Sequence, residues 1–263
     1  MPEGDTVWRA ARQLDRALTG KVLTHTDFRV PAYATWDLSG ATVAQTVSRG
    51  KHLLTRIDAD QSWTLHTHLK MEGAWRVLEP GQRWPRPGHT ARVVLETADA
   101  VAVGFQLGIV EIVPREREAE IVGHLGPDLL GADWDADEAV RRLRMQPGRA
   151  VKEALLDQSN LAGVGNMYAN ELCFLAGAAP ETPVGDVPDL PRMGGRAHQV
   201  LDLNPHRAVQ STTGNLGRGR TFWGHGRGGR ACRRCGTPIV ESMLGETGRE
   251  RVTYHCPSCQ PIR

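Results

Sequence analysis

The pattern of apolar and polar residues changes twice along the chain. Behind the first residues, apolar side chains recur at helical spacing, which predicts a helix that Asp5 or Thr6 caps and Gly20 ends. Its apolar positions are Val7, Ala10, Ala11, Leu14 and Leu18. From about residue 21 to residue 113, short alternating runs are separated by Gly, Pro and Asp. This second pattern predicts the antiparallel strands of a sandwich or barrel.

The second half of the chain has the apolar spacing of short helices. Asp135 precedes one such repeat, and residues 150–158 form another. Residues 160–166 are a glycine-rich turn, after which Asn166 is expected to cap a third helix. This is a helix-turn-helix shape whose exposed N–H groups suit a phosphate, although most such helix pairs are purely structural. Residues 177–192 are rich in Pro and Gly and are predicted to be a loop.

Composition is that of an ordinary soluble protein. Of the 263 residues, 40% are hydrophobic and 24% are charged, which allows one large domain or two to three small ones. No apolar run approaches the roughly 18 residues that span a bilayer. Asp5, Arg9 and Arg12 interrupt the start, so no signal peptide is expected. We therefore expect a cytoplasmic monomer without a membrane partner.

Charge is distributed unevenly, although the formal net charge is only +2. Residues 214–263 hold nine arginines and three glutamates, whereas residues 116–138 hold eight acids and one arginine. The first segment can attract a polyanion, and the second has the composition of a linker. Because four lysines occur against 28 arginines, a lysine is the more specific signal in this chain.

The most specific motif lies near the end of the chain. Two Cys-x2-Cys pairs separated by twenty residues have the spacing of a four-thiolate zinc site. The four ligands would be Cys232, Cys235, Cys256 and Cys259. Cys173 is the only other cysteine and lies in an apolar repeat, so disulfides are not expected. Two short strands are predicted around residues 245–248, in a ribbon whose folding depends on one structural Zn²⁺.

The first residues offer a possible nucleophile. Removal of Met1 would leave Pro2 as a terminal secondary amine, with the carboxyl group of Glu3 one residue away. A helix that starts directly behind an amine favours its neutral, nucleophilic form. An amine that forms a Schiff base beside an acid is an arrangement for covalent catalysis. The alternative is a frayed and solvated terminus, which is the usual state of chain ends.

Three further positions have both a chemical and a structural interpretation. Lys51 lies at a glycine turn before an apolar strand, and could be a catalytic lysine or a solvated hairpin residue. Met71 lies in a turn, and could enter a duplex as an apolar wedge or belong to the core. Arg251 lies in the predicted ribbon on one strand face with Arg249, Thr253 and His255, where it could bind phosphate or only contact solvent.

Taken together, these motifs resemble the formamidopyrimidine-DNA glycosylase/endonuclease VIII family over nearly the whole chain. The resemblance rests on Met-Pro-Glu-Gly at the start, Arg-Gly-Lys at 49–51 and Leu-Leu-Asp-Gln followed by Ala-Gly-Val-Gly-Asn within 155–166. It ends on Cys-Pro-Ser-Cys-Gln at 256–260. The pair Glu3-Gly4 is similar to the endonuclease VIII branch.

The resemblance implies an enzyme of base excision repair that turns a damaged nucleotide out of the duplex. It implies that Pro2 is the nucleophile and Glu3 the acid, that Lys51 assists β-elimination, and that Arg251 serves δ-elimination and phosphate binding. It further implies DNA contacts for Lys70, Met71, His124 and Asn166. Asp5-Thr6 departs from the family's usual Pro-Glu, and residues 104–110 lack the Arg-x-Phe of the 8-oxoguanine branch.

The expected fold is an α+β multidomain protein. Residues 1–115 are expected to form an N-terminal helix with an antiparallel β-sandwich, and residues 116–134 an acidic linker. Residues 135–222 would form a helix-two-turn-helix domain, and residues 223–263 a zinc ribbon. The favoured function is a DNA glycosylase and abasic-site lyase acting on oxidised pyrimidines in damaged DNA. One alternative is a glycosylase for oxidised purines, and another is an enzyme that acts mainly as an abasic-site lyase. A third is a non-catalytic zinc-ribbon protein that binds DNA.

Overall fold

The chain folds into two compact units, residues 1–124 and residues 125–263. The computed structural model describes residues 2–207 and 209–262. Met1, whose removal would expose the Pro2 amine, lies outside the described residues. The finer division into a sandwich, a linker, a helical domain and a ribbon stays a prediction.

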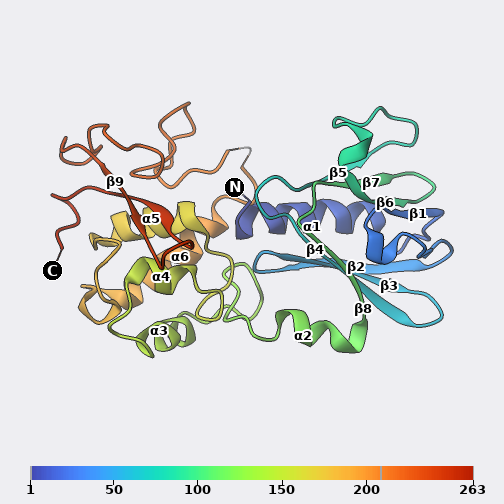
Figure 1. The fold of residues 1–263 in the computed structure, drawn as a ribbon, viewed down its shortest axis with the longest axis horizontal. Helices are drawn as coiled ribbons and strands as arrows, with labels where there is room; N and C mark the ends of the chain where they lie inside the picture. Colours follow the sequence, from blue (N-terminus) through green and yellow to red (C-terminus); the bar gives the residue numbers. More distant parts are fainter. Residues whose placement is uncertain (1, 208, 263) are drawn as a thin grey trace. The chain divides into compact units, whose positions relative to one another are not determined.

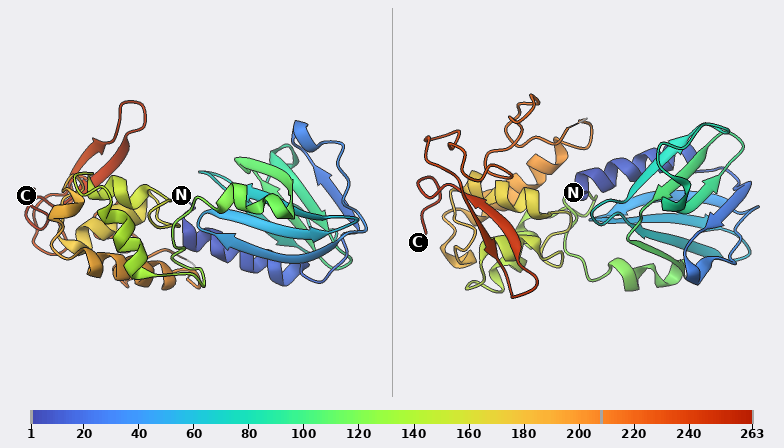
Figure 2. Two further views of the ribbon diagram at one scale, coloured as in Figure 1. Left: turned by 90° about the horizontal axis from the view of Figure 1, so that it is seen from below. Right: turned by 45° about the horizontal axis from the view of Figure 1, so that its top comes forward.

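The first unit begins with the expected amphipathic helix, α1 (Gly4–Leu18). Asp5 or Thr6 was expected to cap it, but Glu3 is the N-cap. The backbone of Glu3 is extended, and its carbonyl oxygen accepts the first helical bond from the Val7 N–H at 3.0 Å. Gly20 has a φ of +78° and ends the helix as expected. The apolar face of α1 packs along β2, β3 and β5 (Figure 2).

Two antiparallel four-stranded sheets form the sandwich, as the alternating pattern predicts (Figure 1). One sheet has the order β2 (Thr42–Arg49), β3 (His52–Asp58), β4 (Ser62–His68) and β8 (Ile109–Pro114). The other has the order β1 (His25–Phe28), β6 (Ala91–Glu96), β7 (Val101–Phe105) and β5 (Ala74–Leu78). A core of buried side chains from both sheets and α1 lies between them.

The alternation of side chains along β3 separates this core from a polar outer face. Leu53 and Ile57 belong to the core, whereas His52 and Arg56 lie on the opposite face. Helix α2 (Glu118–Val122) packs on that polar face, where Glu118 forms a 2.6 Å ion pair with Arg56. Short 3₁₀ turns occur at η1 (Pro31–Tyr33), η2 (Gly88–Thr90), η3 (Arg115–Arg117) and, in the second unit, η4 (Val184–Asp186).

The second unit is built on helices α3 (Ala136–Arg144), α4 (Val151–Leu156), α5 (Asn166–Ala176) and α6 (Leu190–Asp202). Asp135 precedes α3, as predicted, and caps it by accepting hydrogen bonds from two backbone N–H groups. Gly165, rather than Asn166, is the N-cap of α5. Cys173, which lies in the apolar repeat of α5, is fully buried and carries a free thiol.

Helix α6 overturns part of the predicted loop 177–192. Asp189 accepts a hydrogen bond from the Arg192 N–H and caps the helix, and Pro191 occupies its first turn, where a missing N–H costs nothing. Its buried positions recur at helical spacing, at Leu190, Met193, Gly194, Ala197, Val200 and Leu201. Gly194 lies where an added Cβ would come within 3.1 Å of Val140, so its small size allows α6 to approach α3.

The C-terminal segment forms the predicted hairpin, β9 (Val240–Leu244) and β10 (Arg251–His255) (Figure 2). The carbonyl oxygen of Val252 accepts hydrogen bonds from the Lys152 ammonium at 2.7 Å and the Asn166 amide at 3.0 Å. Asn170 accepts a bond from the Tyr254 N–H at 3.0 Å. These polar contacts bind the hairpin to α4 and α5 within one unit.

None of the helices in the described residues has the length and apolar character needed to cross a membrane.

Candidate functional site

The N-terminal residues lie at the start of α1 beside a cavity. Pro2 is half-buried and Glu3 is fully buried, so the two residues are not a frayed terminus. The cavity has a volume of about 600 Å³ and is lined by both Pro2 and Met71. Polar side chains around it include Arg9, Gln13, Arg76, Arg86 and Gln106. The structure therefore places Pro2, which precedes the buried Glu3, and the Met71 turn around one cavity.

Met71 lies at the tip of the turn between β4 and β5 and is 63% exposed. Arg86 donates to the Glu72 carbonyl oxygen at 2.9 Å and to the Gln106 side chain at 2.8 Å, which braces the turn against residues 104–108. Phe105 and Leu107, which lie in the stretch 104–110 that lacks the Arg-x-Phe of the 8-oxoguanine branch, are buried. Met71 is thus the exposed apolar side chain at this edge of the cavity.

Lys51 and Lys70 lie at the same end of the β2-β3-β4-β8 sheet. Lys51 follows Gly50, whose φ of +56° closes the turn between β2 and β3. Lys70 has a φ of +52°, and its backbone N–H donates to Nδ1 of His68 at 2.9 Å. Burial, and after it the charges of Lys70 and Lys51, lower the pKa of His68 to about 4. The charges of both lysines therefore lower the pKa of the same imidazole, that of His68.

His124, in the segment after α2, lies near the group formed by Lys51, Lys70 and His68. Its ring centroid lies 6.5 Å from that of His52, which in turn lies 5.2 Å from that of His68. The fold thus gathers Lys51, Lys70 and His124, which come from three separate parts of the sequence.

Sequence analysis missed the other members of this group. His66 is 2% exposed, and its ring lies between Nδ1 of His52 at 2.9 Å and a carboxylate oxygen of Glu111 at 2.8 Å. The register pairs His52 with His68 and His66 with Glu111 across neighbouring strands. The signal in the sequence was the His-x-His spacing of residues 66 and 68, which places both side chains on one strand face.

In the second unit, Asn166 begins α5. Its side-chain N–H₂ donates to Val252, whereas its buried Oδ1 accepts no hydrogen bond within the described residues. This amide therefore holds the hairpin and does not cap its own helix. The N-terminus of α5 carries the positive end of the helix dipole, which favours an anion such as phosphate.

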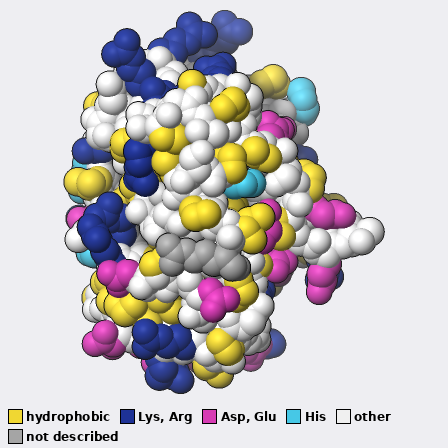
Figure 3. All heavy atoms as spheres, turned by 90° about the vertical axis from the view of Figure 1, so that its left-hand side faces the viewer, with side chains coloured by type: hydrophobic (Ala, Val, Ile, Leu, Met, Phe, Trp, Pro, Cys, Tyr) yellow, Lys and Arg dark blue, Asp and Glu magenta, His cyan; other side chains and the backbone are white. Residues whose placement is uncertain are grey.

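Arg251 begins β10 with an exposed side chain. A cavity of about 680 Å³ is lined by Arg251, Arg249, Arg149 and residues of α4. Arg149 is paired with Asp157 at 2.7 Å. Arg249 lies before the strand and is exposed, as Arg251 is, whereas Thr253 and His255 are buried. The face expected to be shared by these four residues is therefore exposed only at the two arginines. Lys and Arg side chains also form several groups on the face drawn in Figure 3.

A buried carboxylate in α5 organises the arginine-rich segment. Glu171 accepts hydrogen bonds at 2.8 Å from the backbone N–H groups of Trp223, Gly224 and His225, and another from the Thr212 hydroxyl. Sequence analysis did not single out this residue. An acidic residue in an otherwise apolar helical repeat was its only signal.

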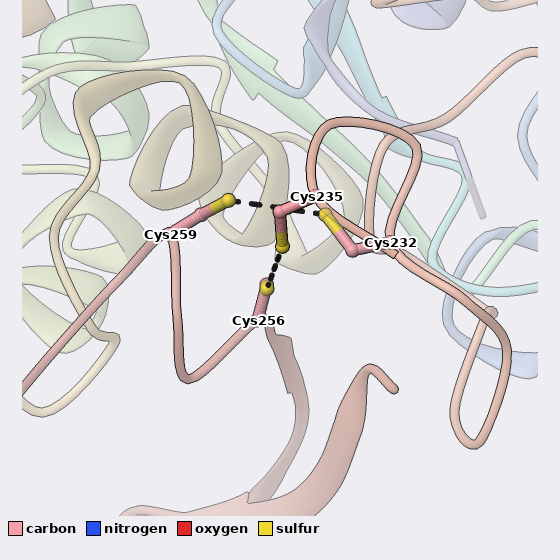
Figure 4. Close-up of side chains that lie close together, drawn as sticks. All are labelled: Cys232, Cys235, Cys256 and Cys259. Atoms are coloured by element: carbon pink, nitrogen blue, oxygen red, sulfur yellow. Dashed lines mark hydrogen bonds between the residues drawn. The ribbon is translucent and has the colours of Figure 1, made fainter. Parts of the chain in front are cut away.

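The four cysteines of the ribbon converge as predicted (Figure 4). Their Sγ atoms all lie within 4.8 Å of one another, with 3.4 Å between Cys235 and Cys256 and 4.0 Å between Cys232 and Cys259. Tetrahedral ligands at the usual Zn–S distance of about 2.3 Å would be about 3.8 Å apart. Burial, and after it the neighbouring thiols, raise the pKa of Cys259 to about 12, so a thiolate at this position needs a nearby cation. The donor set therefore fits a metal ion.

Two family models match the chain. The formamidopyrimidine-DNA glycosylase N-terminal domain matches residues 1–106, and the H2TH domain of the same glycosylase matches residues 125–191. Over 99% of this chain and 94% of the relative, the sequence is 52% identical to a probable endonuclease 8 2 of Streptomyces coelicolor. The chain belongs to the formamidopyrimidine-DNA glycosylase and endonuclease VIII family.

Other relatives show the same full-length match. A DNA-(apurinic or apyrimidinic site) lyase Nei2 of Mycolicibacterium smegmatis is 51% identical, with 99% of each chain covered. Among solved structures, formamidopyrimidine-DNA glycosylase of Lactococcus lactis bound to DNA with an abasic site is similar with a TM-score of 0.81, at 22% identity and with 99% of this chain covered. This family member therefore has the fold that its motifs predicted: a helix and sandwich, a helical domain and a cysteine-bearing ribbon.

Proposed function

We propose that the chain removes oxidised pyrimidines from DNA and then cleaves the strand, through a Schiff base formed by Pro2. At the coarser level, it is a DNA glycosylase and abasic-site lyase of base excision repair, like relatives that are 47–52% identical over its full length. The observation that carries the finer proposal is the position of Pro2 beside buried Glu3 at a cavity that the Met71 turn also lines.

In the proposed reaction, the Pro2 nitrogen attacks C1′ of the damaged nucleotide and gives up its proton. The base leaves with the electrons of the glycosidic bond and takes up one proton. Glu3 donates a proton to the ring oxygen as the sugar opens, which leaves an iminium ion between Pro2 and C1′. Loss of a C2′ proton, assisted by Lys51, breaks the bond from C3′ to its phosphate. A second elimination at C5′ requires a cation on the other phosphate, a role that suits Arg251.

The remaining predicted residues are proposed to hold DNA. Asn166 and the first turn of α5 would bind one phosphate, and Lys70 and His124 another. Met71 would fill the space that the displaced nucleotide leaves. We further expect the protein to act as a cytoplasmic monomer on damaged DNA.

We propose that the ribbon binds one structural Zn²⁺ through Cys232, Cys235, Cys256 and Cys259. The ion would supply a crosslink in a module that is too small to have a large core of its own. The chain's own residues then orient Arg251, because β10 enters directly into the second pair of cysteines.

Borohydride trapping tests the proposed chemistry. Incubation with a duplex that carries an abasic site, followed by reduction, should attach the DNA covalently to the mature protein through the Pro2 nitrogen, and peptide mass spectrometry should locate the bond. Glu3→Gln removes the acid but leaves the amine, so it should slow base removal from a damaged duplex more than trapping at a preformed abasic site. Attachment at a lysine, or no attachment at all, would refute the Pro2 mechanism.

A further inference from the structure

Three titratable side chains form a hydrogen-bonded row on the outer face of the β2-β3-β4-β8 sheet. The row runs from half-exposed Glu111 on β8, through buried His66 on β4, to His52 at the start of β3. The two links measure 2.8 Å and 2.9 Å. His52 directly follows Lys51, so the row ends beside the turn to which the proposed function assigns a catalytic lysine.

The direction of each hydrogen bond follows from the end of the row. An ionised carboxylate can only accept, so Nδ1 of His66 carries the proton that is donated to Glu111. A neutral His66 then has a lone pair at Nε2, which accepts from Nδ1–H of His52. His52 is left with its lone pair at Nε2. The carboxylate therefore fixes the tautomer of an imidazole two residues along the row.

The surroundings of His52 keep it neutral when no ligand is bound. Burial is the largest cause, followed by the charges of His66, His68, His124 and Lys70, and together they lower the pKa of His52 to about 3. Lys51 acts on the neighbouring His68. The charged and titratable groups facing this point are thus Arg49, which the register places opposite His52, together with two lysines and three imidazoles. Glu111 is linked to His52 through His66.

We propose that this row is a proton-linked phosphate grip: a DNA phosphate binds beside Lys51 and Lys70, and His52 takes up one proton at Nε2 as it binds. The inference rests on the proposed function, because it takes the ligand to be the backbone of the damaged strand. The proton comes from solvent, and His52 then donates it in a hydrogen bond to a phosphate oxygen. Nδ1–H of His52 stays bonded to His66, which Glu111 holds in the accepting tautomer, so the imidazolium is stabilised from behind.

The sign of the pH dependence follows from this linkage. A bound phosphate raises the pKa of His52 from about 3 towards or above the ordinary histidine value of about 6.5. Between these values the complex binds more protons than the free components, so affinity for DNA falls as pH rises. The decrease should approach about tenfold per pH unit where one full proton is taken up.

Calorimetry measures this proton directly. The ligand is a duplex with a tetrahydrofuran abasic-site analogue, which has no C1′ leaving group and is not cleaved. Titrations of the zinc-replete full chain at pH 6.0 are compared in two buffers of different ionisation enthalpy. Wild type should take up about 0.5 to 1 proton per duplex more than His52→Gln. His25→Gln is the matched control, because His25 is exposed on β1 of the other sheet, and it should behave as wild type.

Glu111→Gln separates the proton linkage from a structural role. Its side chain can still accept from His66 but lacks the charge that stabilises the imidazolium. It should therefore reduce proton uptake while the thermal midpoint and the zinc content stay close to those of wild type. Equal proton uptake in wild type, His52→Gln and Glu111→Gln would overturn the inference, even though the protein binds the duplex. Failure of wild type to bind this duplex at all would instead refute the proposed function on which the inference rests.

Discussion

The chemistry proposed for Pro2 depends on a single secondary amine, which is exposed only when Met1 has been removed. Glu3 is buried and is the N-cap of α1, so its position is fixed by the helix. Pro2 directly precedes it and is therefore held at the cavity. A residue retained before Pro2 would convert the amine into an amide, which has no nucleophilic lone pair.

We predict that protein with Met1 retained, verified by mass spectrometry, forms no borohydride adduct with abasic DNA. Pro2→Gly should keep a primary amine and trap weakly. Binding of the uncleaved tetrahydrofuran duplex serves as the control and should change little. An adduct formed by the Met1-retaining chain would show that Pro2 is not the nucleophile.

Arg251 should act on product distribution as well as on rate. A hydrogen bond between a guanidinium group and a phosphate is worth about 1.5–3 kcal/mol, so Arg251→Ala should slow incision roughly ten- to a hundredfold. It should also shift products from δ- towards β-elimination, because Pro2 and Lys51 remain. A gel that resolves the two 3′ ends measures both effects.

Arg249→Ala is the matched control for Arg251→Ala. Both arginines line one cavity, but Arg249 lies outside β10, and its loss should have a smaller effect. Zinc content should be unchanged in both variants. A normal rate and a normal product ratio in zinc-replete Arg251→Ala would leave this residue as ordinary ribbon surface.

At the scale of the elements, the ribbon and α5 meet in a small apolar cluster. Phe174 of α5 packs there with Cys232, Ile239 and Cys256, and the ring of Trp223 stacks on it with 5.3 Å between centroids. The metal ligands are thus part of the packing that surrounds this tryptophan.

Metal removal should therefore change the fluorescence of Trp223. A chelator strong enough to remove zinc should shift its emission to longer wavelength and abolish DNA binding, and added zinc should reverse both effects. Trp223→Phe identifies the contribution of this residue among the seven tryptophans. Elemental analysis should find one zinc per chain, and freshly purified protein without stoichiometric zinc would contradict the assignment.

Lys152 should give the stability of the second unit a distinctive pH dependence. Burial is the main cause that lowers the pKa of Lys152 to about 8, whereas an unfolded lysine titrates near 10.4. Between these values the unfolded state binds more protons, so stability rises with pH by at most about 1.4 kcal/mol per unit.

Denaturant unfolding between pH 7.5 and 10 should show this slope in wild type, and a smaller slope in Lys152→Met. The variant also loses the bond to Val252 but avoids burying an ammonium group, so its stability near pH 7.5 should change little. Identical slopes in the two proteins would show that Lys152 does not titrate in this range.

At the scale of the whole molecule, the property to be predicted is which damaged base the protein removes. The buried Phe105 and Leu107 leave Met71 as the exposed apolar side chain at the cavity edge. We predict faster release of oxidised pyrimidines than of 8-oxoguanine from otherwise identical duplexes, with a bare abasic site as the lyase control. Preferred release of 8-oxoguanine would favour the oxidised-purine alternative, and cleavage of the abasic site alone would favour a lyase.

How much could be predicted from the sequence depended on the distance between the interacting residues. The strands, the α4–α5 pair and the cysteine cluster follow from local spacing, and all were found. Helix α6 was missed because Pro191 and a glycine pair hid its helical repeat. The row from Glu111 to His52 was missed because it depends on the register between three strands, which no local pattern contains.

The carbonyl group of Val252 has a consequence for how such proteins can be recombined. Its donors come from α4 and α5, and Tyr254 is bound to α5 in turn, so hairpin and helices share one set of buried polar partners. A hairpin grafted from a distant relative also carries backbone carbonyl groups, but a shift in its path would leave the Lys152 ammonium group and the Asn166 amide of the host helices without this acceptor. A functional chimaera should therefore exchange the ribbon together with α4 and α5, and the boundary between exchangeable modules should lie before residue 151 rather than at the start of the cysteine motif.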